Sequence, residues 1–435
     1  MKTKSFLLLI VLSLFVSCNH NKETNHHVDW VYDATVYEVN VRQFTEEGTF
    51  NAFEKHIPRL KELGVDILWF MPVQPIGEVE RKGTLGSYYS IKNYTAINPE
   101  FGTLEDFRQT VDAAHGAGMK VILDWVANHT SHDAVWALKH KDWYVTDSLG
   151  NVVSPYDWTD VAQLNFDNAD MCNAMQEAMI FWLKETNIDG FRCDHAVGIP
   201  AVFWESAIDE LKKVKPDIFM LAEAEAPELN IKAFDAYYAW NIHHKMNEIA
   251  QGKANVNSLR EALKDLSNFP DYAIPMYFTS NHDENSWAGT EFERMGDAAR
   301  TFAVLTYILP GMPLIYNGQE VGFNRRLEFF EKDVINWNDS DGNFTTFYQD
   351  LIQLKKANKA LFCQELGGKL EEITTSKPDE IFAVQRKVGN RMKNKTKNDG
   401  IIAIFNLSPN VVEFTIDSPQ VSLSSLSPWE YRIIY

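Results

Sequence analysis

The chain has 435 residues, of which 45% are hydrophobic, 13% aromatic and 23% charged. This composition excludes a chain that is disordered overall, and it supplies more apolar side chains than one small domain can bury. The formal net charge is −19, which argues against binding to nucleic acid, because phosphate backbones are held by clustered lysines and arginines. A neutral substrate is compatible with such an acidic chain.

The first 17 residues have the pattern of a secretory signal peptide. A basic start precedes an apolar run over residues 6–16, which is too short to span a bilayer as a helix. The run ends in Ser17-Cys18 and resembles a bacterial lipobox, although Phe15 stands where leucine is usual. We expect an exported, membrane-anchored lipoprotein, periplasmic or at the cell surface, with a lipid on Cys18 and a tether over residues 18–30. An ordinary signal peptide is the alternative.

From about Tyr32, short and continuously apolar runs alternate with segments of helical periodicity. Continuous apolarity suits parallel strands that are buried on both faces. Eight strands are expected, over residues 35–41, 66–73, 120–127, 189–194, 217–225, 233–240, 273–281 and 313–318. Eight such units predict an α/β fold, a (β/α)8 TIM barrel over residues 31–128 and 171–358. The alternation by itself leaves a doubly wound sheet as the rival.

The segments between the predicted strands carry helix signals. Residues 50–64 have apolar side chains at helical spacing and end in Gly64, which indicates a C-cap. Residues 103–118 open with Thr103, and Asp106 follows three positions later, a pattern close to a capping box.

Two regions depart from the barrel rhythm. The third and fourth strands lie about 70 residues apart, whereas the fourth and fifth lie about 30 apart. We expect a small inserted domain over residues 129–170, without a clear helix, above the carboxyl ends of the strands where barrel active sites are built. Residues 359–435 alternate apolar and polar positions between turn residues, which predicts a C-terminal antiparallel β domain.

Several predicted strands end in an acidic residue. Asp194, Glu223 and Asp283 are 29 and 60 residues apart, which corresponds to one and two βα units. They should therefore project into one bowl at the mouth of the barrel. Each of them alone could be a helix N-cap, but folding gives no reason to gather three carboxylates that repel one another.

Paired carboxylates are the equipment of glycoside hydrolysis. One attacks the sugar or activates water, and the other protonates the leaving oxygen. Like-charge repulsion raises the pKa of one carboxyl and keeps it protonated, as a general acid requires. Arg192 should point to the same side as Asp194 and hold it ionised. His129 and His282, as neutral imidazoles, could donate hydrogen bonds to sugar hydroxyls.

The motifs around these residues resemble those of a known enzyme family. The chain resembles the α-amylase-type retaining glycosidases of glycoside hydrolase family 13, whose four signature regions are present and in order. They read "DWVANHT", "GFRCDHAVGIP", "LAEAE" and "FTSNHDEN". The resemblance runs from about Val31 to Glu320 and extends into the terminal β domain.

The resemblance implies roles for single residues. Asp194 matches the nucleophile, Glu223 the general acid and then base, and Asp283 the stabiliser of the transition state. Glu225 lies close by, but Glu223 occupies the motif position. The residues matched to substrate binding and its support are Tyr89, which stacks under the cleaved glucose, His129, Arg192 and His282, which bind it, and Asp124, which supports the hydrogen-bond network.

Some positions depart from the family pattern. Many starch-cleaving members have Lys-His where this chain has Val197 and Gly198, so the contacts on the leaving-group side must differ. Asn128 matches a calcium ligand in many members, which leaves a structural calcium ion open. We expect no cofactor and no metal ion in catalysis itself.

Cys193 and His195 flank Asp194 and raise the alternative of a metal or thiol site. Strand alternation argues against it, because both should face the helical layer while Asp194 faces the bowl. With Cys18 lipidated, the other three cysteines are an odd number and no disulfide framework.

The leading hypothesis is a retaining α-glucan hydrolase that cleaves α-1,4-glucosidic bonds of starch or maltodextrins by double displacement. The first alternative is an exo-acting or α-1,6-specific α-glucosidase, or a transglucosylase of the same family. The second is a non-catalytic glycan-binding lipoprotein on a decayed barrel.

Overall fold

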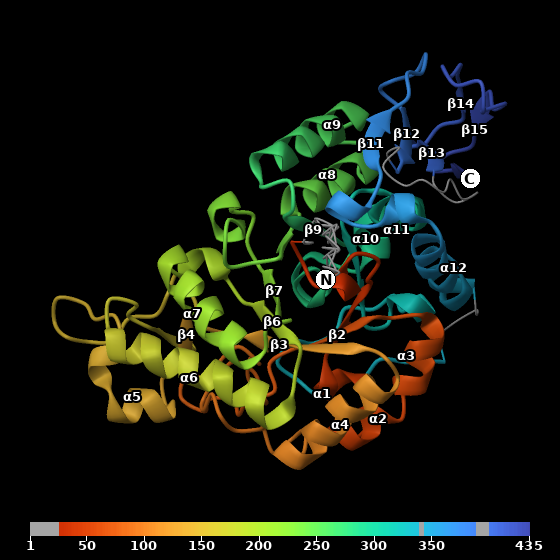
Figure 1. Ribbon diagram of the computed structural model, residues 1–435. Coiled ribbons are helices and arrows are strands. Elements are labelled where there is room, and N and C mark those ends of the chain that lie inside the picture. The colour runs from red at the N-terminus through yellow and green to blue at the C-terminus, as the bar shows by residue number, and fades with distance from the viewer. Residues whose placement is uncertain (1–25, 339–342, 389–399) are drawn as a thin grey trace, which may run out of the picture.

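The computed structural model describes residues 26–338, 343–388 and 400–435 (Figure 1). Eight parallel strands close into a barrel in the order β1-β10-β9-β8-β7-β6-β3-β2. They are β1 (Val36–Val39), β2 (Ile67–Phe70), β3 (Lys120–Trp125), β6 (Gly190–Cys193), β7 (Phe219–Ala222), β8 (Ala236–Tyr238), β9 (Ile274–Tyr277) and β10 (Met312–Tyr316). The eight predicted strands are confirmed, and the closed barrel excludes the doubly wound sheet.

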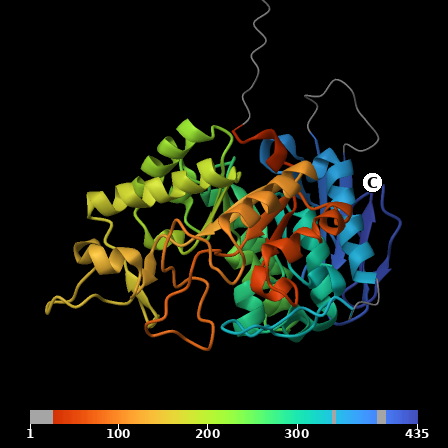
Figure 2. The ribbon, with the colours of Figure 1, turned by 90° about the horizontal axis from the view of Figure 1, so that it is seen from below.

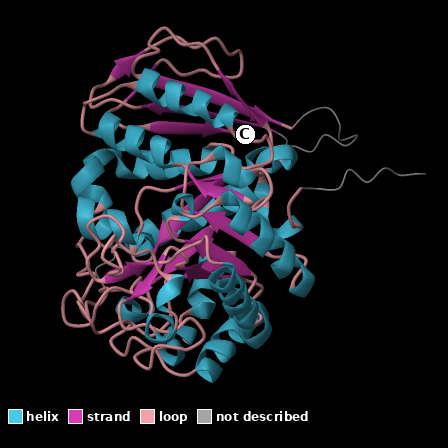
Figure 3. Ribbon diagram, turned by 90° about the vertical axis from the view of Figure 1, so that its left-hand side faces the viewer, coloured by secondary structure: helices cyan, strands magenta, loops and turns pink. Residues whose placement is uncertain are grey.

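Helices surround the barrel on its outside (Figure 3). They are α1 (Val41–Phe44), α2 (Phe50–Glu54), α3 (Ile57–Leu63), α4 (Leu104–Gly116), α6 (Ala169–Thr186), α7 (Ala201–Val214), α8 (Trp240–Ala250), α9 (Val256–Asp265), α10 (Glu291–Met295), α11 (Ala299–Ile308) and α12 (Asn343–Ala357). Thr103 and Asp106 form the expected capping box of α4, and Gly64 ends α3 with a left-handed φ of 101°. Between β7 and β8 the chain makes only the 3-10 helix η4 (Pro227–Asn230), so this unit lacks the expected α-helix.

The barrel interior changes character along its length. Near the amino ends of the strands, the inward side chains of Ile122, Phe219 and Ile274 are fully buried in one apolar cluster. Val31 and Tyr32, which precede β1, join this cluster and close the floor of the barrel. Towards the carboxyl ends, the inward positions of the same sheet become charged, and these charges belong to the site described below.

The segment between β3 and β6 departs from the barrel pattern. Within it, β4 (His129–Ser131) pairs antiparallel with β5 (Val161–Gln163). It also contains the five-residue helix α5 (Val135–Lys139) and a 3-10 turn. The prediction that this segment has no clear helix was therefore wrong. The segment projects sideways at the left of Figure 1 and of Figure 2. The exact domain boundaries stay predictions.

The C-terminal region is antiparallel β structure, as predicted. Its main sheet runs β11-β12-β13-β16, and β14 (Val412–Glu413) pairs with β15 (Ser425–Leu426). The main-sheet strands are β11 (Lys369–Glu372), β12 (Ile381–Lys387), β13 (Gly400–Asn406) and β16 (Tyr431–Ile434). The buried guanidinium of Arg386 donates to the carbonyls of Ile308 and Leu309, which fastens this sheet to the end of α11.

The predicted signal peptide and the lipid site at Cys18 lie outside the described residues. Among the residues that are described, no helix combines the length and the apolarity needed to cross a membrane. His27 fixes the beginning of the described chain to the barrel floor. Its Nδ1 lies 2.8 Å from Asp235 Oδ1, and its Nε2 lies 2.6 Å from the Tyr272 carbonyl oxygen.

Candidate active site

The structure brings the three predicted carboxylates together. Asp194 follows β6, Glu223 follows β7, and Asp283 lies six residues beyond β9. All three line one pocket of about 260 Å³ at the carboxyl ends of the strands. The spacing of one and two βα units therefore predicted their meeting correctly.

Arg192 is the centre of charge in this site. Its side chain is fully buried, and its Nη1 lies 2.9 Å from Asp124 Oδ1 and 3.1 Å from Asp194 Oδ1. Its Nη2 lies 2.9 Å from Glu223 Oε2 but is not aligned to donate a hydrogen bond to it. One cation thus faces three carboxyl groups, and at least one of these is expected to hold a proton.

Burial raises the pKa of Glu223 and of Asp283. Desolvation raises the pKa of Glu223, and the charge of Asp194 adds to this rise while Arg192 opposes it. Desolvation also raises the pKa of Asp283, against the nearby His282. A glutamic acid with a raised pKa beside an arginine-paired aspartate is the division of roles that acid catalysis needs.

His282 links the site to a second buried acid, Glu38 of β1. Its Nδ1 lies 2.5 Å from Glu38 Oε1, and its Nε2 lies 2.9 Å from the Tyr89 hydroxyl and 3.2 Å from Asp283 Oδ2. Burial alone would lower the pKa of His282, but Asp283 and Glu38 outweigh burial and raise this pKa to about 9. The expectation of a neutral imidazole is therefore wrong for His282, which is an imidazolium at neutral pH.

His129 has the neutral imidazole ring that was predicted for it. Burial lowers the pKa of His129 to about 4, so its ring is neutral. It lines the same pocket as Asp194 and Glu223.

Asp124 lies one layer deeper than the three pocket carboxyls and is fully buried, which raises its pKa to about 7. Besides Arg192, it accepts hydrogen bonds from Trp69 Nε1 at 3.1 Å and from the Tyr89 hydroxyl at 3.0 Å. The Tyr89 ring lies nearly parallel to the His282 ring, with centroids 5.4 Å apart. Asp124 thus holds Tyr89, which lines the pocket, and Arg192, which is fully buried and is not among the residues that line it. This agrees with the supporting place expected for Asp124.

Cys193 and His195 do not share one environment. Cys193 is fully buried in the apolar cluster between barrel and helices, as strand alternation predicted. His195 instead lines the pocket, so its expected orientation towards the helical layer was wrong. The reason is local, because β6 ends at Cys193 and His195 has a left-handed φ of 43°, which breaks the alternation.

Glu225 is separate from the pocket carboxyls. Its Oε2 accepts a hydrogen bond from the backbone nitrogen of Asn241, 3.0 Å away in the first turn of α8. This contact gives it a structural partner at a helix N-terminus, where carboxylates are favoured.

Sequence reasoning missed Glu38 and several residues of the pocket wall. Glu38 had a signal, because it is a charged residue inside the apolar run of β1; it lies behind the pocket, in contact with His282. The missed wall residues have no periodic pattern. They are Trp287, in the short π-helix after Asp283, and the loop residues Lys82, Trp158, Asp160, Phe329 and Phe330. Their aromatic rings and the Lys82–Asp160 ion pair of 2.9 Å form the walls of the pocket.

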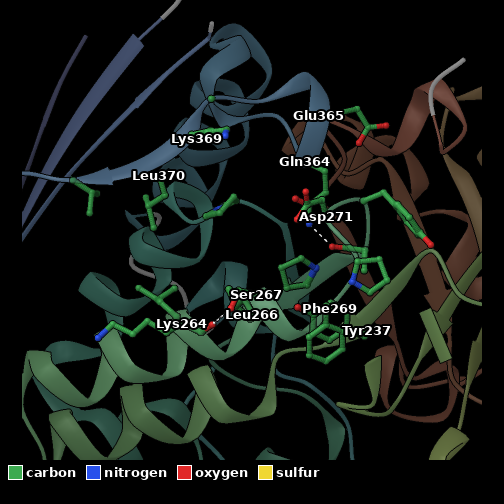
Figure 4. A pocket seen from close by; sticks show the side chains of 18 of the residues that line it. Tyr237, Lys264, Leu266, Ser267, Phe269, Asp271, Gln364, Glu365, Lys369 and Leu370 are labelled. Carbon is green, nitrogen blue, oxygen red and sulfur yellow. Dashed lines mark hydrogen bonds between the residues drawn. The ribbon is translucent and has the colours of Figure 1, made fainter. Parts of the chain in front are cut away.

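A larger cavity, of about 980 Å³, lies elsewhere, between the loop before β9 and the C-terminal sheet (Figure 4). Figure 4 shows Tyr237 and Phe269 side by side on one wall and Lys369 and Leu370 on the opposite one. Ala273, which directly precedes β9, is one of its lining residues, so the cavity lies at the amino end of that strand. Barrel enzymes build active sites at the other end, so size alone does not identify the site here.

Asn128 is the residue that matches a calcium ligand of the family. The side-chain nitrogen of Asn128 lies 3.3 Å from His129 Nδ1. Among the residues that the structure describes, no group of three or more His, Cys, Asp or Glu side chains is placed to hold a metal ion. These side chains do not offer the carboxylate set that calcium prefers, and the calcium site stays a prediction.

The fold and the pocket define a class, the (β/α)8 barrels with carboxylates gathered at the carboxyl ends of their strands. Residues 23–358 match the catalytic domain of alpha-amylase. The chain belongs to this family, as the four signature regions indicated.

Similar proteins agree with this assignment. The chain is 26% identical over 393 residues to alpha-amylase MalA of Haloarcula japonica, which covers 87% of this chain and 56% of MalA. It therefore spans little more than half the length of that relative. An alpha-amylase from Lactobacillus plantarum has a TM-score of 0.82 at 28% identity and covers 93% of this chain and 99% of its own. A maltogenic alpha-amylase, AmyB, from Thermotoga neapolitana has a TM-score of 0.81 at 26% identity, with 89% of each chain covered.

Proposed function

We propose that this protein is a retaining α-glucan hydrolase that cleaves α-1,4-glucosidic bonds of starch or maltodextrins. The observation that carries the proposal is the convergence of Asp194, Glu223 and Asp283 on one pocket, around the buried Arg192. The names of the similar proteins, alpha-amylase and maltogenic alpha-amylase, support the substrate class.

In the first step, the Asp194 carboxylate attacks the anomeric carbon of the bound sugar. Glu223 gives its proton to the glycosidic oxygen as the bond between that oxygen and the anomeric carbon breaks. Arg192, whose Nη1 lies 3.1 Å from Asp194 Oδ1, holds this carboxylate in position. Asp283 stabilises the positive charge that develops on the sugar ring. The sugar is then an ester of Asp194, and the shortened glucan leaves with the proton.

In the second step, the Glu223 carboxylate takes a proton from water. The oxygen of that water attacks the anomeric carbon, and the ester bond to Asp194 breaks. Asp194 leaves as a carboxylate, and Glu223 is protonated again. Each step inverts the anomeric centre, so the product keeps the α configuration of the substrate.

The test is hydrolysis of soluble starch and maltoheptaose by the wild-type protein and by Asp194→Asn. Loss of the nucleophile is expected to lower the rate of sugar release by roughly 10⁴-fold or more. Asp271→Asn, which removes a carboxylate from the larger cavity, serves as the matched control and should keep full activity. An Asp194→Asn variant with unchanged activity would refute the mechanism.

A second candidate stays within the family, an exo-acting or α-1,6-specific α-glucosidase or a transglucosylase. The small pocket favours exo action, because its volume of about 260 Å³ lies below the ~300–1,000 Å³ typical of ligand pockets. Panose, isomaltose, pullulan and trehalose separate these activities. Products longer than the substrate would reveal transfer, and cleavage of isomaltose would reveal α-1,6 specificity.

We also propose that the protein is exported and anchored by a lipid on Cys18. The support is the basic start, the short apolar run and the Ser17-Cys18 end of that run. Metabolic labelling with an alkyne fatty acid should mark the wild-type protein in the membrane fraction. Cys18→Ser should lose the label, and a label that persists would contradict the anchor.

A further inference from the structure

Two residues with left-handed backbone meet at the edge of the pocket. Tyr156 has a φ of 52° and His195 a φ of 43°, and neither is glycine. The Tyr156 hydroxyl lies 3.0 Å from His195 Nε2. Such conformations are unfavourable for ordinary side chains, and they concentrate at ligand-binding and catalytic sites, where the surrounding structure holds them.

Aromatic rings gather around this pair. The Trp158 ring lies 4.9 Å from Tyr156 and 5.4 Å from His195, measured between centroids. Trp158 and His195 line the pocket, while Tyr156 is 71% exposed at its rim. An exposed, polar-edged aromatic surface beside a pocket suits the C–H faces and hydroxyls of a sugar.

The cluster of Tyr156, Trp158 and His195 lies next to Glu223, the proposed acid, and this position indicates which sugar it would contact. The backbone nitrogen of His195 donates to Glu223 Oε2 over 2.8 Å. Glu223 is the group proposed to protonate the leaving oxygen, so the chain beside its carboxyl borders the leaving sugar. A separate aromatic group, which includes Phe329, lies against Tyr89, with ring centroids 6.2 Å apart.

Gly198 makes room for the imidazole. A Cβ atom at Gly198 would lie 2.5 Å from His195 Cδ2 and 2.8 Å from His195 Nε2, which is closer than real contacts allow. The His195 ring thus occupies the space that a side chain at position 198 would take. A histidine side chain at position 198, as in the Lys-His pattern, would overlap the ring of His195. The two side chains therefore cannot occupy this space together.

We propose that His195, with Trp158 and Tyr156, forms the subsite for the leaving sugar, in place of the Lys-His pair that this chain lacks. The inference rests on the proposed function and names the residues that recognise the sugar on the leaving-group side. His195 is a specificity-determining residue here, since its imidazole faces the departing sugar while its backbone holds the acid.

The test compares two substrates that differ only in the leaving group. Maltotetraose, cleaved in its middle, places a sugar in the proposed subsite, whereas α-maltosyl fluoride releases fluoride and leaves that subsite empty. His195→Asn removes the imidazole, and asparagine tolerates the left-handed backbone. We expect kcat/KM for maltotetraose to fall about 10- to 100-fold, with the fluoride value within about threefold of wild type.

Retained fluoride turnover shows that the variant is folded. Tyr156→Phe is the matched variant, since it keeps the ring and loses only the hydroxyl contact to His195. It should shift the ratio of the two substrates in the same direction by a smaller factor. The double variant His195→Asn/Gly198→His should regain part of the maltotetraose rate.

Two results would overturn the inference. An equal fall with both substrates would mean that His195 acts on Asp194 or on folding, and no fall with either would mean that it contacts no sugar. Failure of the wild-type protein to cleave either substrate would instead refute the proposed function on which the inference rests.

Discussion

The two ends of the barrel differ in chemistry although the same strands build both. At the floor, Ile122 of β3 and Phe219 of β7 are fully buried among apolar side chains. Two positions along β3 the inward residue is Asp124, and four positions beyond Phe219 it is Glu223. The floor buries apolar area and stabilises the fold, whereas the mouth gathers buried charges that folding does not favour. Stability and activity are therefore expected to separate along single strands.

After loss of the nucleophile, the largest effect should come from Glu223→Gln at the mouth. Without a proton donor, hydrolysis of maltoheptaose should fall about 10²- to 10⁴-fold. A maltoside with a 2,4-dinitrophenyl leaving group needs no proton, so formation of its glycosyl-enzyme should stay close to the wild-type rate. Stopped-flow release of dinitrophenol measures that step.

Glu225→Gln is the matched control for this experiment. Its carboxylate serves the first turn of α8 and does not line the pocket, so the variant should keep the wild-type rate on maltoheptaose. A result in which Glu225→Gln loses activity and Glu223→Gln keeps it would reverse the assignment of the acid.

The next largest effect is expected from a substitution at the floor of the barrel. Phe219→Ala should lower the free energy of unfolding by about 3–5 kcal/mol, because it leaves a cavity in the apolar cluster. The measurement is chemical denaturation, with kcat/KM on maltoheptaose taken at 25 °C, where the folded variant should match wild type. Phe330→Ala at the mouth is the matched change and should lower activity more than stability. Equal losses of activity in both variants would break the distinction between floor and mouth.

A smaller effect concerns the pH dependence of stability at the mouth. Burial raises the pKa of Glu223 in the folded state, so the folded protein loses stability as pH rises from the unfolded value, ~4.3, through the folded one. Glu223→Gln cannot ionise. As pH rises from the unfolded to the folded pKa of Glu223, the free energy of unfolding of Glu223→Gln should therefore rise relative to that of wild type, by about 0.5–2 kcal/mol. A difference that is constant from pH 4 to pH 8 would contradict the buried acid.

The smallest effect concerns His27 at the floor. Burial alone would lower the pKa of His27, but the hydrogen bond and charge of Asp235, together with the Tyr272 carbonyl and Glu365, outweigh burial and raise it. The stabilisation from this pair is complete below the unfolded value, ~6.5, and is lost as pH rises through the folded value. His27→Gln should therefore destabilise the protein by about 1 kcal/mol at pH 5.5 and by less at pH 8.5. Thermal unfolding at both pH values checks this, and a cost that grows with pH would contradict the pair.

The two ends also differ in how far the sequence predicts them. The strands and the three carboxylates were predictable, because continuous apolar runs and spacings of whole βα units follow directly from the barrel. Arg192 was predictable from strand alternation, which holds as long as the strand continues. His195 was not, since β6 ends at Cys193 and the left-handed turn that follows leaves no mark in the local pattern.

The residues of the pocket walls could not be predicted from the sequence, for a related reason. Lys82 and Asp160 lie 78 positions apart in different loops, and their ion pair depends on how those loops fold over the mouth. The charge of His282 was likewise mispredicted, because it depends on Glu38, which lies far away in sequence on β1. Contacts between loops and between distant buried charges come from tertiary structure, which periodicity does not encode.

Double displacement by Asp194 and Glu223 fixes the configuration of the first product, which can be measured. Proton NMR during the first minutes of maltoheptaose hydrolysis resolves the two anomers before they interconvert. Under double displacement the α anomer should appear first, and the β anomer should grow later by mutarotation. Initial release of the β anomer would show single displacement by water and would contradict Asp194 as the nucleophile.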